Sequence, residues 1–191
     1  MKLRLLLVLL AFLLADAAGF WWWYYWQRER SQDAPILAAA RCYGLAPSLV
    51  KAVVWRETWF DPNARGRAGE IGLMQLREPA AREWAEAERL INFHHEQLVD
   101  PGTNTLAGAW YLTKALRRYT HTDNPVPYAL ADYNAGRGNV LRWLHGAAVT
   151  NSAVFIEQIG FPSTRHYVET VLVRAEKYRP IFPAADGESK R

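Results

Sequence analysis

The sequence predicts an all-α fold. In segment after segment, apolar residues recur at spacings of three and four, as in a helix that buries one face. Proline stands near the expected helix starts and glycine follows several expected ends, while the period-two alternation that indicates strands is scarce. With 191 residues, half of them apolar, the chain is long enough to bury a core. We therefore expect a single helical domain preceded by an N-terminal hydrophobic helix.

Residues 1–30 predict a targeting segment. Lys2 and Arg4 precede an apolar run, and a second apolar stretch ends in the aromatic residues Trp21–Trp26, which suit a membrane interface. The combined length is close to the ~20 residues that span a bilayer. Residues 15–17 form a weak match to a signal-peptidase site. Two alternatives follow: an uncleaved membrane anchor, which we favour slightly, and a cleaved signal peptide. Either one places the remaining chain outside the cytoplasm.

Composition narrows the range of partners. The formal charge of +4 favours anionic partners such as nucleic acid, phospholipid or an acidic cell-wall polymer. Lysine and arginine are scattered, however, which argues against nucleic acid. Cys42 is the only cysteine, so a disulfide framework, a cysteine-based metal site and a lipid-modified cysteine near residue 20 are all excluded.

Helices are expected in succession from residue 31 to residue 183. The first begins with Asp33 as its cap and ends at Gly44, and the second begins at Pro47 and carries Glu57. Further helices are predicted from Pro79 through Trp84, from Asp100 through Leu116, over Val126–Tyr133, around Val140–Leu144 and over Tyr167–Tyr178. The expected inward face of the helix from Asp100 is Leu106, Ala109, Trp110, Thr113 and Leu116. The polar residues 184–191 are expected to form a flexible tail.

Glu57 is the candidate around which the site is predicted. It follows Val54, Val53 and Val50 by three, four and seven positions, so its carboxyl group shares the apolar face of its helix. Desolvation there disfavours the charged form and raises the pKa of a glutamate from about 4.3 toward about 6, which suits a general acid. The same pattern also fits a glutamate that pairs with a buried arginine or turns to solvent.

Five motifs in order carry a family resemblance. They are Glu57-Thr58, Gly69–Gln75, Asn104–Leu112, Ala131–Gly136 and Thr164–Val168. Together they resemble the catalytic domain of soluble lytic transglycosylases, which is related in fold to goose-type lysozyme, and the resemblance covers about residues 35–180. It implies a lysozyme-like helical domain with a groove for peptidoglycan glycan strands, on the periplasmic side of the cell envelope.

The resemblance implies a role for Glu57 as the single catalytic acid and base. It would protonate the glycosidic oxygen that leaves N-acetylmuramic acid and then accept the proton of the sugar's 6-hydroxyl, closing a 1,6-anhydro ring with no metal or cofactor. The candidate substrate-binding residues are Gln75, Tyr133, Asn134, Met74, Thr58, Tyr167 and Glu70. Without the motif context, Gln75 reads as a backbone-capping amide and Tyr133 as a core aromatic. Met74 is interpreted as a packing residue that could also touch the sugar.

The chain departs from the family pattern at three positions near Glu57. Thr58 and Gly66 stand where serines are common. Glycine has no hydroxyl, so support for Glu57 from the second of these positions is missing and another donor must serve. Glu70 stands where alanine is usual, in a glycine-rich turn that returns the chain past Glu57. We favour Glu70 as a solvated turn residue or a partner of Arg67. The alternative is a second carboxylate across the groove.

Two other functions stay open beside the transglycosylase. One is a muramidase-type hydrolase of the lysozyme kind, which Glu70 would assist. The other is a non-catalytic peptidoglycan-binding protein, which would be expected to lack Glu57. We expect a monomer that binds glycan strands and contacts the membrane through its N-terminal segment.

Overall fold

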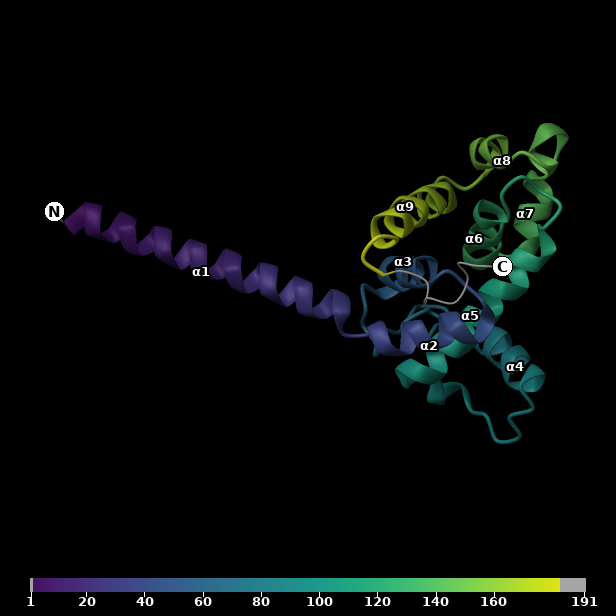
Figure 1. The fold of residues 1–191 in the computed structure, drawn as a ribbon, viewed down its shortest axis with the longest axis horizontal. Helices are drawn as coiled ribbons and strands as arrows, with labels where there is room; N and C mark the ends of the chain where they lie inside the picture. Colours follow the sequence, from purple (N-terminus) through teal and green to yellow (C-terminus); the bar gives the residue numbers. More distant parts are fainter. Residues whose placement is uncertain (1, 183–191) are drawn as a thin grey trace, which may run out of the picture. The chain divides into compact units, whose positions relative to one another are not determined.

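The computed structural model describes residues 2–182, so the predicted tail at 184–191 lies outside the described residues. The chain divides into two compact units, Met1–Gln32 and Asp33–Arg191. The first unit contains one helix, α1 (Lys2–Arg30), drawn in purple in Figure 1. Its aromatic residues are exposed to solvent and contact one another, for example Trp21 and Tyr25 with ring centroids 5.6 Å apart.

Helix α1 matches the expected hydrophobic N-terminal helix. By length and composition, the helical stretch Arg4–Tyr43 contains a segment apolar enough to cross a membrane. A signal sequence near the N-terminus meets the same criterion, so both predictions for this segment stand. At the end of α1, the guanidinium group of Arg30 lies 4.1 Å from the ring centroid of Trp26.

The second unit is helical, as the sequence predicts, and within the described residues it contains isolated β-bridges but no strand. The α-helices are α2 (Asp33–Tyr43), α3 (Pro47–Thr58), α4 (Glu78–Ala87), α5 (Pro101–Arg118), α6 (Pro125–Ala135), α7 (Arg137–Trp143), α8 (Ser152–Gln158) and α9 (Pro162–Tyr178). Two short 3-10 helices, η1 (His95–Val99) and η2 (Gly146–Val149), complete it.

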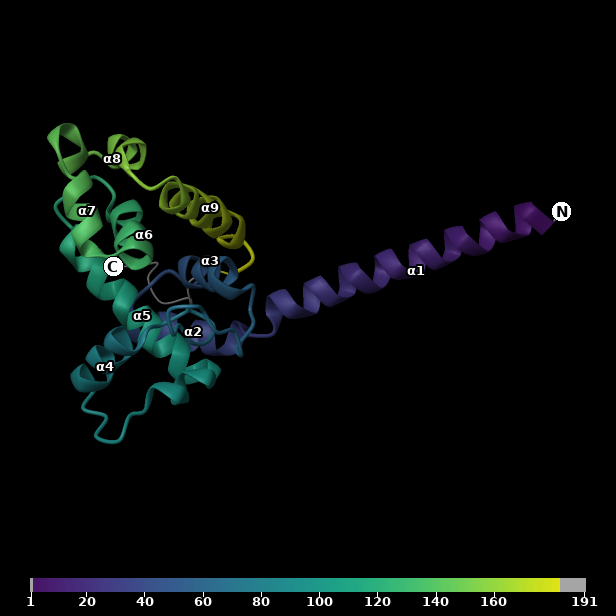
Figure 2. The same ribbon diagram turned by 180° about the vertical axis from the view of Figure 1, so that it is seen from behind.

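Helix α3 lies at the centre of this unit. It packs along α9, beside it in both Figure 1 and Figure 2, and it also contacts α2. The predicted apolar stripe is its buried face, because Val50, Val53 and Val54 are each 0% exposed. The helix ends where Trp59 adopts a left-handed conformation with φ 53°. Glu57 is thereby placed in the last turn, at the edge of the core.

Helix α5 fixes the turn that follows α3. The side chain of Asn104 is fully buried; its Oδ1 accepts a hydrogen bond from the backbone N–H of Met74 (2.8 Å) and its Nδ2 donates to the carbonyl of Ile71 (2.8 Å). At Gly108 a Cβ atom would lie 2.3 Å from the Sδ of Met74, so only glycine allows this close approach. The turn at residues 71–76 is therefore held against α5.

Some sequence expectations about the helices were wrong. Asp33 is the first residue of α2 rather than its cap, and its carboxylate pairs with the buried Lys51 at 2.5 Å. In α5, Ala109 is buried, but the rest of the expected inward face is only half-buried. The buried face instead includes Thr105, Gly108, Leu112 and Ala115. Small residues let α5 pack closely on its neighbours, which an apolar stripe does not reveal. Helix α8 was not predicted.

Candidate functional site

A cavity of about 370 Å³ lies where the end of α3, the turn after it and the end of α6 meet. It brings together five of the predicted site residues, Glu57, Glu70, Gln75, Tyr133 and Asn134. The remaining lining residues are Leu76, Arg77, Ala80, Tyr111, Asp132, Ala135 and Gly136. Residues far apart in the sequence thus surround one hollow that opens to solvent.

Glu57 has an unusually high proton affinity in this cavity. Burial raises the pKa of its carboxyl group from 4.5 to about 7, because the surroundings replace the water that would stabilise the charge. A hydrogen bond from Tyr167 and the positive charge of Arg56 act in the opposite direction, and the negative charge of Glu70 raises the pKa further. The shift has the predicted direction. It leaves Glu57 able both to donate and to accept a proton near neutral pH.

Tyr167 supplies Glu57 with the hydrogen-bond donor that Gly66 cannot provide. Its hydroxyl donates to Oε1 of Glu57 at 2.7 Å. The ring is only 2% exposed, and the guanidinium group of Arg56 lies 5.5 Å from its centroid. Tyr167 therefore reaches Glu57 from the first half of α9 and fixes the orientation of the carboxyl group.

The sequence offered two interpretations of Gln75, a residue of the binding site and a backbone-capping amide, and the structure agrees with both. Its Nε2 donates to the carbonyls of Gly72 (3.0 Å) and Ala64 (3.2 Å), which makes it a backbone-capping amide. The residue itself has φ 49°, and its side chain lines the cavity beside Glu57. Gln75 thus shapes the wall of the cavity while remaining accessible to a ligand.

Tyr133 and Asn134 stand in the last turn of α6. The hydroxyl of Tyr133 donates to the carbonyl of Met74 at 2.7 Å, and its ring meets that of Tyr111 edge-on with centroids 5.7 Å apart. Asn134 is exposed, and its Oδ1 accepts from the hydroxyl of Thr164 at 2.8 Å. These contacts hold both side chains in place, and both residues line the cavity.

Glu70 lies in the same cavity as Glu57 but is bound by its own turn. Its Oε2 accepts a hydrogen bond of 2.9 Å from the backbone N–H of Ala68. A Cβ atom on Gly66 would overlap this carboxylate, so glycine makes room for it. Within the described residues Arg67 forms no ion pair with it. Glu70 is therefore a turn-capping residue that also brings negative charge to the site.

Besides Tyr167, which contacts Glu57 directly, two predicted site residues, Met74 and Thr58, do not line this cavity. Met74 is 0% exposed and packs against Gly108. The hydroxyl of Thr58 donates to the carbonyl of Leu73 at 3.0 Å and to that of Val54 at 3.3 Å. Both side chains hold the turn against neighbouring helices: Met74 packs on α5, and Thr58 links the turn to α3 by its hydrogen bonds. The full burial of Met74 agrees with its interpretation as a packing residue.

Among the lining residues that were not predicted as site residues, three have charged or phenolic side chains: Arg77, Tyr111 and Asp132. Asp132 is fully buried, and its Oδ2 accepts from Arg118 (2.8 Å) and from the hydroxyl of Tyr119 (2.9 Å). Tyr111 lies seven positions after Asn104 and so shares a face of α5 with it, a spacing that the sequence shows. Among residues 2–182, no three histidine, cysteine, aspartate or glutamate side chains gather as metal ligands do.

Residues 34–156 match the family described as the transglycosylase SLT domain. The chain belongs to this family. The matched stretch contains Glu57, Glu70, Gln75, Tyr133 and Asn134, whereas Tyr167 follows it.

Individual relatives agree with membership of the SLT family. The chain is 32% identical over 137 residues to the soluble lytic murein transglycosylase of Salmonella typhimurium, covering 71% of this chain and 21% of the relative. It is 36% identical over 105 residues to the membrane-bound lytic murein transglycosylase F of Desulfosudis oleivorans, covering 53% and 21%. The structure resembles an inactive mutant of the lytic transglycosylase Slt from Pseudomonas aeruginosa, with a TM-score of 0.69 and 32% identity over 78% of this chain and 24% of that one. The chain thus spans about a fifth to a quarter of these relatives.

Proposed function

We propose that the chain is a peptidoglycan lytic transglycosylase that cleaves the β-1,4 bond between N-acetylmuramic acid and N-acetylglucosamine and forms 1,6-anhydro-N-acetylmuramic acid. The environment of Glu57 is the observation on which this proposal rests. A single carboxyl group with a pKa raised to about 7 lies in an open cavity of an SLT-family domain, hydrogen-bonded to one buried tyrosine. The names of its relatives as murein transglycosylases support the same substrate.

In the first step Glu57 acts as an acid. The neutral carboxyl group transfers its proton to the glycosidic oxygen, and the bond between that oxygen and C1 of the muramic sugar breaks. The sugar's own N-acetyl carbonyl stabilises the oxocarbenium-like centre, so no second protein carboxylate is required. Burial favours this step, because it keeps the proton on Glu57 until the leaving oxygen takes it.

In the second step the same residue acts as a base. The Glu57 carboxylate accepts the proton of the sugar's 6-hydroxyl while O6 forms a bond to C1, which restores the protonated enzyme. An oxygen of the same sugar has a high effective concentration, so it outcompetes water. The hydrogen bond from Tyr167 to Oε1 stabilises the carboxylate formed between the two steps.

A muramidase-type hydrolase is the second candidate, because Glu70 lines the cavity with Glu57. In that reaction Glu70 would activate a water or stabilise the sugar cation. The hydrogen bond from the N–H of Ala68 favours the transglycosylase, since it directs one oxygen of Glu70 to its own turn.

We further propose that α1 tethers the domain to the inner membrane, with the site on the periplasmic side. The exposed apolar and aromatic side chains of α1 support an anchor, and relatives named as membrane-bound are consistent with one.

Product analysis tests the proposed function. Purified sacculi are digested with the full chain, with Glu57→Gln and with Glu169→Gln, a control that makes the same change on the exposed side of α9. We expect 1,6-anhydromuropeptides by mass spectrometry. We expect the Glu57 variant to lose activity by about 10²-fold or more, because an amide cannot exchange the proton. The control should retain activity. Muropeptides with reducing ends as the main product would refute the transglycosylase assignment.

A further inference from the structure

Arg56 directly precedes Glu57 on α3, and its side chain is half-buried. Its guanidinium group lies over the ring of Tyr167, 5.5 Å from the ring centroid, which is within the range of a cation–π contact. The hydroxyl of the same ring donates the 2.7 Å hydrogen bond to Oε1 of Glu57. A cation, a buried phenol and the proposed catalytic carboxyl group are thus in contact one after the other across α3 and α9.

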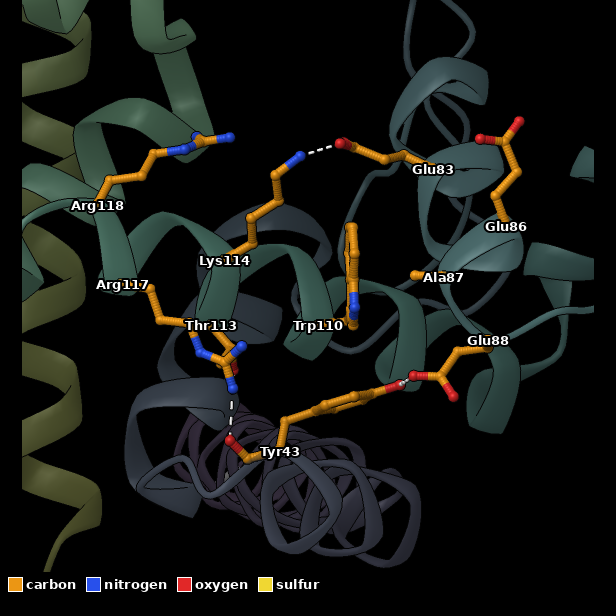
Figure 3. A pocket seen from close by; sticks show the side chains of 10 residues that line it. All are labelled: Tyr43, Glu83, Glu86, Ala87, Glu88, Trp110, Thr113, Lys114, Arg117 and Arg118. Atoms are coloured by element: carbon orange, nitrogen blue, oxygen red, sulfur yellow. Dashed lines mark hydrogen bonds and ion pairs between the residues drawn. The ribbon is translucent and has the colours of Figure 1, made fainter.

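Arg56 differs from cations of the second unit that have a carboxylate partner. In the cavity of about 770 Å³ between α4 and α5, for example, Lys114 forms an ion pair with Glu83 (Figure 3). Within the described residues Arg56 forms no such pair, and the groups on which it acts are the ring of Tyr167 and the charge of Glu57. The positive charge of Arg56 is therefore not neutralised by a neighbouring carboxylate.

The position of this charge affects the hydroxyl of Tyr167. A cation over the face of a phenol stabilises negative charge on the ring, so it makes the hydroxyl a stronger hydrogen-bond donor. Burial and the charge of Glu57 raise the pKa of Tyr167 well above its usual value, and the charge of Arg56 acts in the opposite direction. Because the ring is only 2% exposed, solvent weakens this effect little.

Other groups that face Glu57 do not favour its charged form. Burial has the largest influence and raises the pKa of Glu57, and the negative charge of Glu70 raises it further. Tyr133 approaches from α6, but its hydroxyl donates to a backbone carbonyl. The influences that favour the carboxylate come from Tyr167 and Arg56, and these two side chains contact each other.

We propose that Arg56 is a positioning residue that acts through Tyr167. By lying over the ring, it holds the phenol against Glu57 and strengthens the hydrogen bond to the carboxylate that exists between the two steps of the reaction. Tyr167 keeps its own proton throughout, and the proton that leaves Glu57 goes to the glycosidic oxygen as before. The inference rests on the proposed function, since it takes Glu57 as the group that transfers this proton.

A second arginine on the same pair of helices provides a matched control. Arg174, on α9, lies over the ring of Trp55, on α3, at 3.9 Å from the ring centroid, and it is half-buried like Arg56. Its charge is not among the influences that shift the pKa of Glu57. Arg174→Met therefore removes a cation–π contact between α3 and α9 and leaves the surroundings of Glu57 in place.

The activity test measures kcat on purified sacculi as a function of pH. We expect Arg56→Met to lower the limiting kcat about 10-fold and to move the alkaline limb to higher pH, because the Glu57 carboxylate loses stabilisation. Arg56→Lys keeps a cation that can lie over the ring, so its kcat should stay within about three-fold of the unmodified chain. An unmoved pH profile in Arg56→Met, or an equal fall in Arg174→Met, would overturn the proposal.

A double-mutant cycle tests whether the effect passes through the hydroxyl of Tyr167. In Tyr167→Phe the ring remains for the cation, but the donor to Glu57 is gone. Adding Arg56→Met to Tyr167→Phe should then lower kcat by at most about three-fold. A further fall of about 10-fold, equal to that in the unmodified background, would show that Arg56 acts without Tyr167 and would overturn the proposal.

An NMR titration separates this inference from the proposed function. The side-chain carboxyl carbon of Glu57 is assigned by its loss in Glu57→Gln, and its pKa is measured in the full chain in detergent micelles. We expect this pKa to rise in Arg56→Met, to rise less when the same change is made in Tyr167→Phe, and to stay unchanged in Arg174→Met. If the unmodified chain released no product from sacculi, the proposed function would fail, and the titration would still decide whether Arg56 acts on Glu57 through Tyr167. A pKa of Glu57 that is the same with and without Arg56 overturns the inference.

Discussion

The hydroxyl of Tyr167 donates a hydrogen bond of 2.7 Å to Oε1 of Glu57, although the two residues are 110 positions apart. The contact links the last turn of α3 to α9, two helices that pack along each other. Because the donor is buried, it acts on Glu57 without competition from solvent. The pair sets both the orientation and the proton affinity of the proposed catalytic group.

Tyr167→Phe should therefore change the chemistry more than the fold. Loss of the hydroxyl removes an interaction that lowers the pKa of Glu57, so that pKa should rise further. We expect kcat to fall about 10-fold to 100-fold, and the alkaline limb of the pH profile to move to higher pH. Tyr128→Phe is the control, since it removes a buried hydroxyl whose 2.9 Å bond goes to the carbonyl of Ala148. A fall in activity with an unmoved pH profile would mean that Tyr167 acts only through packing.

The pKa of Glu57 also predicts how activity and stability depend on pH. Activity that needs the neutral carboxyl group should decline as pH rises above about 7. The folded protein binds the proton more tightly than the unfolded chain does. The stabilisation from that proton is thus complete below pH 4.5 and is lost as pH rises through about 7. Glu57→Gln should accordingly be more stable than the unmodified chain at pH 8, and little different at pH 4, in urea unfolding. Equal stabilities at both pH values would contradict the raised pKa.

The sequence predicted the parts of the site that depend on local pattern. Pro47 and the valine stripe placed Glu57 on a buried helix face, and the motifs brought Gln75 and Tyr133 to it. What it could not predict are contacts between distant segments. No local pattern connects Arg118 to the buried Asp132.

Packing by small residues was also hidden from the sequence. The apolar stripe of α5 suggested that Trp110 faces the core, whereas Gly108 and its buried neighbours form the packed face, and Trp110 lines a cavity. Hydrophobicity alone does not distinguish an aromatic residue in the core from one at a binding surface.

Asn104 should be important for stability as well as for the site. It is fully buried and makes hydrogen bonds to Met74, Ile71 and Leu98, and alanine would leave all three backbone groups without these partners. We expect Asn104→Ala to lower the free energy of unfolding by about 2–4 kcal/mol, measured by urea denaturation. Asn139→Ala, which removes a half-buried amide bonded to the carbonyl of Ala135, should have an effect below about 1.5 kcal/mol. Similar losses in both variants would show that the turn does not depend on α5.

The role of α1 can be tested by fractionation. If α1 is an uncleaved anchor, the full chain should remain in the membrane fraction after salt and alkaline washes, and a phosphatase fused to its C-terminus should be active outside the cytoplasm. A chain that starts at Asp33 behind a cleavable signal peptide is the soluble control. Recovery of a mature protein beginning near Ala18 would show that the segment is a cleaved signal peptide.

Glu70 distinguishes the transglycosylase from the hydrolase. In the first reaction Glu57 acts alone, and Glu70 only adds negative charge nearby, so Glu70→Ala removes one influence that raises the pKa of Glu57. We expect a modest loss, within about 10-fold, and unchanged 1,6-anhydro products by mass spectrometry, because the group that transfers the proton is retained. Glu70→Gln provides the matched variant, since it keeps an oxygen to accept from the N–H of Ala68 and removes only the charge. A loss in both variants as severe as that of Glu57→Gln, with reducing-end products from the unmodified chain, would make Glu70 a second catalytic carboxylate and the chain a hydrolase.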